Sequence, residues 1–83
     1  MKLTIRYFAS IREDLGVSSE MLDTAAATLA ELRDDLLLRS AAHADALARG
    51  KAVRMALNQV MSDESASLRD GCEVAFFPPV TGG

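Results

Sequence analysis

The last six residues, Pro78-Pro79-Val80-Thr81-Gly82-Gly83, have the clearest potential for chemistry. The two prolines hold φ at about −65° and favour an extended backbone, so this segment is predicted to project away from the rest of the chain. Six extended residues reach on the order of 20 Å. Because Gly82 and Gly83 have no side chains, their backbone could enter a channel too narrow for a β-carbon.

The terminal carboxylate of Gly83 is the group that could react. A C-terminal carboxyl ordinarily has a pKa of about 3.3–3.7, so at neutral pH it is an anion and a poor electrophile until an enzyme activates it. The other candidates are weaker. Cys72 is predicted to be a small structural residue and His43 a solvated surface residue. Asp34 and Asp35 cannot form a catalytic pair on a helix, since adjacent residues do not face each other.

The composition limits the classes of function. Eighty-three residues form one domain, and 49% apolar with 25% charged residues is typical of a soluble globular protein. A net charge of −3 without a basic stripe argues against nucleic acid, and no apolar run could span a membrane. One cysteine and one histidine predict no disulfide, no metal site and a reducing, cytoplasmic setting. So short a chain has little interior for a deep pocket, which we expect a partner to supply.

The first strand is predicted over residues 2–9 because apolar and polar residues alternate there. Leu3, Ile5 and Tyr7 would lie on the buried face, and Phe8 on the other. Residues 10–15 then predict one or two helical turns that end at Gly16, and residues 17–22 predict a weak second strand.

The main helix is predicted to begin at Thr28, which forms a capping box with Glu31. Leucines at positions 29, 32 and 36 make an apolar stripe, and Asp35 with Arg39 makes an i,i+4 ion pair. Residues 41–49 either continue this helix or form a second short one that ends at Gly50.

Three further strands are predicted in the second half of the chain. They cover residues 53–57, 60–61 and 73–77, with turns at Asn58-Gln59 and Asp70-Gly71. The order of elements predicts an α+β domain, one sheet packed on one main helix, over residues 1–77. Residues 78–83 form the extended tail.

The segment Asp70-Gly71-Cys72-Glu73-Val74-Ala75-Phe76-Phe77-Pro78-Pro79-Val80-Thr81-Gly82-Gly83 resembles the C-terminal signature of the MoaD family, the small subunits of molybdopterin synthase. Tyr7-Phe8-Ala9-Ser10-Ile11-Arg12-Glu13 and Asn58-Gln59 fit the same family. Cys72 departs from it, since members often carry an acid there. The resemblance implies a β-grasp (ubiquitin-like) fold with a mixed sheet of about five strands.

The resemblance also implies a cytoplasmic sulfur carrier that is not a catalyst alone and binds no cofactor. In this family an adenylyltransferase uses ATP to convert the C-terminal carboxylate, here that of Gly83, to an acyl-adenylate. Persulfide-derived sulfur displaces AMP and leaves a thiocarboxylate, a 1-thioglycine. The tail then enters the large subunit of a heterotetrameric complex, where sulfur passes to cyclic pyranopterin monophosphate.

The alternation also predicts a docking surface. Phe8 and Phe77 would both face outward, and the first and last strands of a β-grasp sheet are neighbours, so the two rings would form one exposed aromatic patch. We expect Arg12 and Met61 at its rim. Pro78, Pro79, Val80 and Thr81 would contact the partner along the tail.

Three other functions fit the same residues. A ThiS-like carrier for thiamine thiazole synthesis uses the same Gly-Gly chemistry, although such chains are typically shorter and lack the Phe-Phe-Pro-Pro approach. A ubiquitin-like modifier would join Gly83 to lysines of other proteins. A binding module without covalent chemistry would use the tail only to fill a groove.

Overall fold

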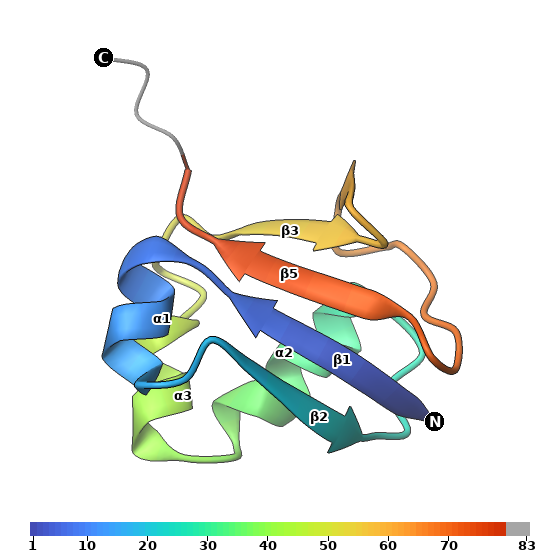
Figure 1. Cartoon of the computed structure of the whole chain (residues 1–83), viewed down its shortest axis with the longest axis horizontal. Coiled ribbons are helices and arrows are strands. Elements are labelled where there is room, and N and C mark those ends of the chain that lie inside the picture. The colour runs from blue at the N-terminus through green and yellow to red at the C-terminus, as the bar shows by residue number, and fades with distance from the viewer. Residues whose placement is uncertain (80–83) are drawn as a thin grey trace.

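Five strands form one mixed sheet in the order β2-β1-β5-β3-β4 in the computed structural model, which describes residues 1–79 (Figure 1). The elements are β1 (Lys2–Tyr7), α1 (Ala9–Leu15), β2 (Ser19–Asp23), α2 (Leu29–Leu37), α3 (Ala41–Ala46), β3 (Arg54–Leu57), β4 (Val60–Ser62) and β5 (Glu73–Phe77). β1 and β5 are parallel, and the other neighbouring strands are antiparallel. The predicted α+β class is confirmed, and the first and last strands lie side by side.

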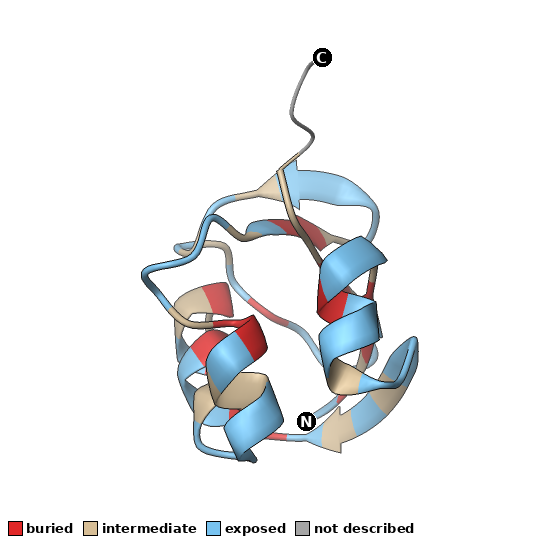
Figure 2. Cartoon of the chain, turned by 90° about the vertical axis from the view of Figure 1, so that its left-hand side faces the viewer, coloured by how far each residue is buried: buried red, intermediate tan, exposed pale blue. Residues whose placement is uncertain are grey.

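The alternation predicted for the two central strands is confirmed. Leu3, Ile5 and Tyr7 of β1 are buried, as are Val74 and Phe76 of β5. These side chains and the inward sides of the helices form one core (Figure 2). The helices cover this face of the sheet and leave the opposite face open (Figure 1).

The start of α2 follows the predicted capping box with one difference. The Glu31 amide donates to Thr28 Oγ1 at 3.3 Å, but the Glu31 carboxylate accepts from the amide of Ala27, also at 3.3 Å, and not from Thr28. The first contact supplies a partner for an amide that the first helical turn leaves free, and the second pairs the amide of Ala27, just before the N-cap. The predicted leucine stripe is fully buried: Leu29, Leu32 and Leu36.

The chain forms a separate short helix after α2, which decides between the two alternatives for residues 41–49. Ser40 caps α3, since its Oγ accepts from the His43 amide at 3.1 Å. Arg33 of α2 then holds the other end: its buried side chain donates to the carbonyls of Leu47 and Ala48, at 2.8 Å each. The Ala48 carbonyl also accepts from the Lys51 amide at 2.9 Å, so Arg33 adds a second donor there and stabilises the turn toward β3.

The predicted ion pair between Asp35 and Arg39 is wrong. Arg39 Nε lies 3.2 Å from Glu20 Oε1 on β2, and the Asp35 carboxylate accepts a hydrogen bond from Thr24. An exposed i,i+4 pair contributes only about 0.3–0.5 kcal/mol, so tertiary partners easily replace it.

The prediction that His43 is a solvated surface residue is also wrong. Its side chain is 12% exposed, and Nε2 lies 2.9 Å from Glu20 Oε2 while Nδ1 lies 2.7 Å from Ser40 Oγ. The Tyr7 hydroxyl donates to the same Glu20 oxygen at 2.8 Å. We call these residues, with Arg39, the Glu20 cluster. It joins β1, β2 and α3 on the face of the sheet that the helices cover.

The Glu20 cluster determines how its members ionise. Burial raises the pKa of Glu20, but the donors His43 and Tyr7 and the charge of Arg39 lower it, and the net shift is downward from 4.5. Burial, and next the hydrogen bond to Glu20, raise the pKa of Tyr7 well above its ordinary value. Glu20 is therefore a carboxylate and Tyr7 a neutral hydrogen-bond donor at neutral pH.

We predict that Glu20→Gln lowers the free energy of unfolding at neutral pH. The difference in this free energy between the variant and the wild type should become smaller in acid. A carboxylate whose pKa is lowered by folding stabilises the fold above its unfolded pKa, and that contribution is lost as the pH falls through the folded pKa. Urea unfolding of both proteins between about pH 6 and about pH 3 measures this. Glu13→Gln, on the exposed side of α1, is the control and should show no such narrowing.

Candidate docking site

A groove of about 470 Å³ lies on the open face of the sheet and runs along β5, from Glu73 at the start of the strand to Phe77 at its end. Its lining residues come from β1, β5 and the β3–β4 turn: Arg6, Phe8, Gln59, Glu73, Ala75 and Phe77. The two phenylalanines that the alternation placed outward thus line one groove, and both are half-buried. Its role as a partner site remains a prediction.

Phe8 is held at the groove by its backbone. Its amide donates to the Phe76 carbonyl at 3.1 Å, which extends the parallel pairing of β1 with β5 by one residue. Ala9 then takes a φ of 51°, a left-handed conformation that turns the chain sharply into α1. The guanidinium carbon of Arg6 lies 5.3 Å from the centre of the Phe8 ring, a cation–π contact.

The predicted Asn58-Gln59 turn is confirmed, and it closes one side of the groove. Both residues have positive φ, 50° and 68°, which matches the tight turn of a two-residue hairpin. Asn58 accepts from the Glu73 amide through Oδ1 at 2.9 Å and donates its own amide to the Glu73 carbonyl at 2.8 Å. The hairpin is thereby fixed to the start of β5, with Gln59 beside the groove.

The other predicted rim residues lie near the groove but do not line it. Arg12 is exposed on α1, and its amide donates to the Phe8 carbonyl at 3.3 Å. Met61 is 57% exposed, and its register places it on the open face in one row with Ala56 and Ala75. Met61 is therefore continuous with the floor of the groove across β3.

The predicted tail contacts are only partly within the structure. Pro78 and Pro79 follow β5 directly and are half-buried. Four predicted site residues lie outside the described part of the chain: Val80, Thr81, Gly82 and Gly83.

The sequence patterns did not indicate Arg54 and Glu73 as site residues. Arg54 lies opposite Phe77 in the register of β3 with β5, so both side chains are on the open face. Glu73 lines the groove, 4.0 Å from Arg6. The alternation of Arg54 with the buried Met55 was visible in the sequence, but not that β3 pairs with β5.

Comparison with known proteins identifies the family. The sequence model of the ThiS family matches residues 5–83, nearly the whole chain. The chain belongs to the ThiS family. A curated relative, the molybdopterin synthase sulfur carrier subunit of Haemophilus influenzae, is 38% identical over 81 residues, which cover 98% of this chain and 99% of that protein.

Two solved structures resemble this ThiS-family chain over its full length. A complex of subunits 1 and 2 of molybdopterin-converting factor from Helicobacter pylori contains a chain with a TM-score of 0.71 and 28% identity, with 100% of each chain covered. SAMP1 from Haloferax volcanii has a TM-score of 0.77 and 25% identity, also with 100% of each chain covered. The β-grasp, ubiquitin-like fold is confirmed.

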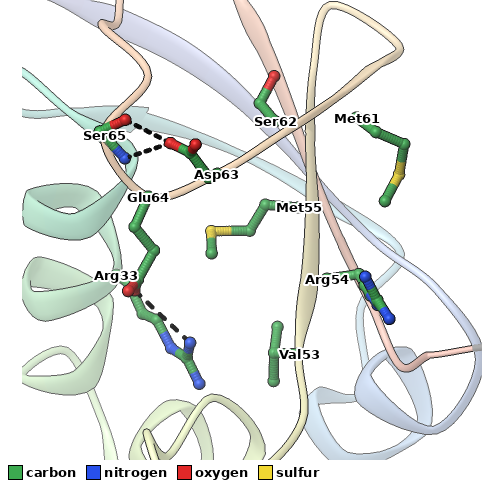
Figure 3. A pocket seen from close by; sticks show the side chains of 9 residues that line it. All are labelled: Arg33, Val53, Arg54, Met55, Met61, Ser62, Asp63, Glu64 and Ser65. Carbon is green, nitrogen blue, oxygen red and sulfur yellow. Dashed lines mark hydrogen bonds and ion pairs between the residues drawn. The ribbon is translucent and has the colours of Figure 1, made fainter.

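A second groove of this ThiS-family chain, about 600 Å³ in volume, lies between α2, β3 and residues 61–65 (Figure 3). Arg54 lines this groove too and has no carboxylate of residues 1–79 within 4.0 Å, but the other charged side chains have partners: Arg33 lies 3.7 Å from Glu64, and the Asp63 carboxylate accepts from the amide and hydroxyl of Ser65. The Ser65 hydrogen bonds lower the pKa of Asp63. These groups have structural partners, so this groove is a weaker candidate than the aromatic one.

The remaining candidates fit structural roles. Cys72 is buried in the core, as predicted for a small structural residue. Within residues 1–79, His, Cys, Asp and Glu side chains form no group of three or more that could hold a metal ion. In the same range no helix is long and apolar enough to cross a membrane.

We predict opposite effects for charges at two adjacent positions. Phe76→Glu should destabilise the fold by at least about 3 kcal/mol, because Phe76 is fully buried in the core. Phe77→Glu should leave the chain folded, since its side chain lies on the open face. Thermal unfolding of both variants measures this, and an unfolded Phe77→Glu variant beside a stable Phe76→Glu variant would contradict the assignment of the faces.

Proposed function

We propose that this ThiS-family chain is the sulfur-carrier subunit of a molybdopterin synthase and that its reactive group is the carboxyl of Gly83. One observation carries the proposal: two outward phenylalanines line a groove along β5, the strand whose sequence continues into a Gly-Gly tail. The named relatives support it, because the Haemophilus influenzae protein carries this function in its name and matches 98% of the chain.

The first step is activation of the carboxyl by an adenylyltransferase. The Gly83 carboxylate attacks ATP, releases pyrophosphate and becomes an acyl-adenylate with AMP as its leaving group. The outer sulfur of a persulfide then attacks the acyl carbon and displaces AMP, which gives an acyl disulfide. A thiol cleaves the S–S bond of this acyl disulfide, forms a disulfide with the donor's remaining sulfur and so supplies the two electrons that free the thiocarboxylate. The resulting thiocarboxylate is a nucleophile, and covalent carriage divides a difficult transfer into easier steps.

The second step is delivery of sulfur to cyclic pyranopterin monophosphate in the large subunit. Docking through Phe8 and Phe77 would fix the point where the tail begins, and six extended residues reach on the order of 20 Å from it. Holding a tethered nucleophile in position can lower the barrier by several kcal/mol. This chain supplies the reacting atom and its reach, and the large subunit supplies the acids and bases.

A ubiquitin-like modifier is the second candidate, favoured by the full-length similarity to SAMP1 from Haloferax volcanii. A modifier would use the same activated carboxyl but form an isopeptide with lysines of other proteins. Conjugates of this chain with other proteins would appear as bands of higher mass in a gel of lysate from the source organism. Loss of these bands on deletion of Gly83 would support that function. A thiamine-type carrier is distinguished by the product that its sulfur enters, since it would support thiazole synthesis and not molybdopterin synthesis.

We predict that sulfur is carried on Gly83. Incubation with the adenylyltransferase, ATP and a sulfur donor should replace one oxygen of the protein by one sulfur. Tandem mass spectrometry should locate that sulfur on the C-terminal peptide. Cys72→Ser is the control and should gain sulfur equally, because Cys72 is buried. If the sulfur were located on Cys72 and were lost in the Cys72→Ser variant, the carrier mechanism would be contradicted.

We also predict that one alanine added after Gly83 abolishes activity but not docking. It moves the reacting carboxyl by about 3.5 Å and adds a β-carbon to the residue that must be adenylated. Reacting atoms in a productive complex lie within about 3–3.5 Å, so the shift cannot be absorbed. Affinity for the large subunit should persist while molybdopterin formation in a reconstituted assay collapses. Full activity without proteolytic trimming in the mass spectrum would refute the mechanism.

A further inference from the structure

The arginines of this acidic chain fall into two groups. The chain has nine basic and twelve acidic residues. On the helical side, three arginines are paired with carboxylates: Arg33 with Glu64 (3.7 Å), Arg39 with Glu20 (3.2 Å), and Arg49 with Asp34 (2.7 Å) and Glu64 (2.6 Å). Their charges are largely neutralised within the fold.

The arginines around the aromatic groove are not neutralised in this way. Arg54 and Arg12 are exposed, and neither has a carboxylate of residues 1–79 within 4.0 Å. Arg6 reaches Glu73 only at 4.0 Å, and both side chains are partly exposed. We call Arg6, Arg12 and Arg54 the arginine rim. It is a local positive patch on a chain with a net charge of −3.

The backbone places each rim residue next to a phenylalanine of the groove. Arg54 is directly opposite Phe77, and such cross-strand neighbours have β-carbons about 4.5–5.5 Å apart. Figure 3 shows Arg54 on the side of β3 opposite to Met55. Arg6 lies over the Phe8 ring, and Arg12 is one helical turn after Phe8.

The remaining cations lie elsewhere. Lys51 lies beside α1 and α3. Lys2 is at the opposite end of β1 from Phe8, and Arg69 precedes the Gly71 turn, whose amide donates to the Lys2 carbonyl at 2.7 Å. The positive charge near the two phenylalanines is therefore a local feature, and Arg69 is an exposed arginine that lies before the start of β5, at the opposite end of this strand from Phe77.

We propose that the arginine rim docks on a surface of the large subunit that carries carboxylates around an apolar centre, with Arg54 facing a carboxylate beside the Phe77 contact. This rests on the proposed function and adds the chemistry of the partner. A guanidinium matches a carboxylate in two parallel hydrogen bonds, and rim charges chiefly raise the rate of association. A basic partner surface would be repelled, and a net charge of −3 disfavours a polyanion as the occupant.

The experiment measures the association rate of the full chain with the purified large subunit of the same organism. It uses about 0.1 M and about 1 M sodium chloride, because the Debye length falls from about 10 Å to about 3 Å between them. The variants are Arg54→Gln, Arg12→Gln and both together, with Arg54→Lys to restore charge. Arg69→Gln is the matched control, since it removes the same charge at the opposite end of β5 from Phe77.

We expect the wild-type association rate to fall at least about tenfold at high salt. At low salt the double variant should associate at least about fivefold more slowly, Arg54→Lys close to wild type, and Arg69→Gln within about twofold of wild type. Binding that does not depend on salt, or equal effects of Arg54→Gln and Arg69→Gln, would overturn the acidic partner surface and leave the carrier function standing. Absence of wild-type binding at both salt concentrations would overturn the carrier function and this proposal together.

Discussion

The parallel pairing of β1 with β5 is the constraint on which the site depends. It places Tyr7 opposite Phe76, and the two rings stack in the core with centroids 6.2 Å apart. Because successive residues of a strand point to opposite faces, Phe8 and Phe77 must then both lie on the open face. A slip by one residue would exchange the buried and exposed rings. One register therefore fixes both the core and the groove.

Polar contacts on both sides hold the two strands of this pair to their outer neighbours. On one side Glu20 accepts from Tyr7 and is also paired with His43 and Arg39. On the other side Asn58 bonds both backbone groups of Glu73 at the start of β5. A largely buried carboxylate is unfavourable without donors, so a shift of β1 against β2, which would separate Glu20 from Tyr7, is disfavoured. The strands that carry the groove are thus tied to a helix and to a hairpin.

The sequence predicted features that depend on near neighbours along the chain. The strand alternation that buries Tyr7, the Thr28 cap and the Asn58-Gln59 turn each involve a few consecutive residues. It did not predict contacts between distant residues: His43 and Glu20 are 23 positions apart, and Arg39 binds Glu20 and not Asp35. Phe8 and Phe77 were brought together only by a strand adjacency taken from the family. Arg54 required the further pairing of β3 with β5, which no local pattern reveals.

In the proposed function the chain is a carrier that must leave each partner it visits, and the division of the arginines has a physical consequence for such a role. Half-buried Phe8 and Phe77 have already lost part of their contact with water in the free chain, so their burial on docking adds less apolar area than two exposed rings would. Charges at a rim raise the rate of encounter more than they slow dissociation. A modest apolar centre with a charged rim therefore favours contacts that form quickly and remain reversible. The lasting bond is covalent, and in the proposed function it lies at Gly83, so the docking face need not hold the partner tightly.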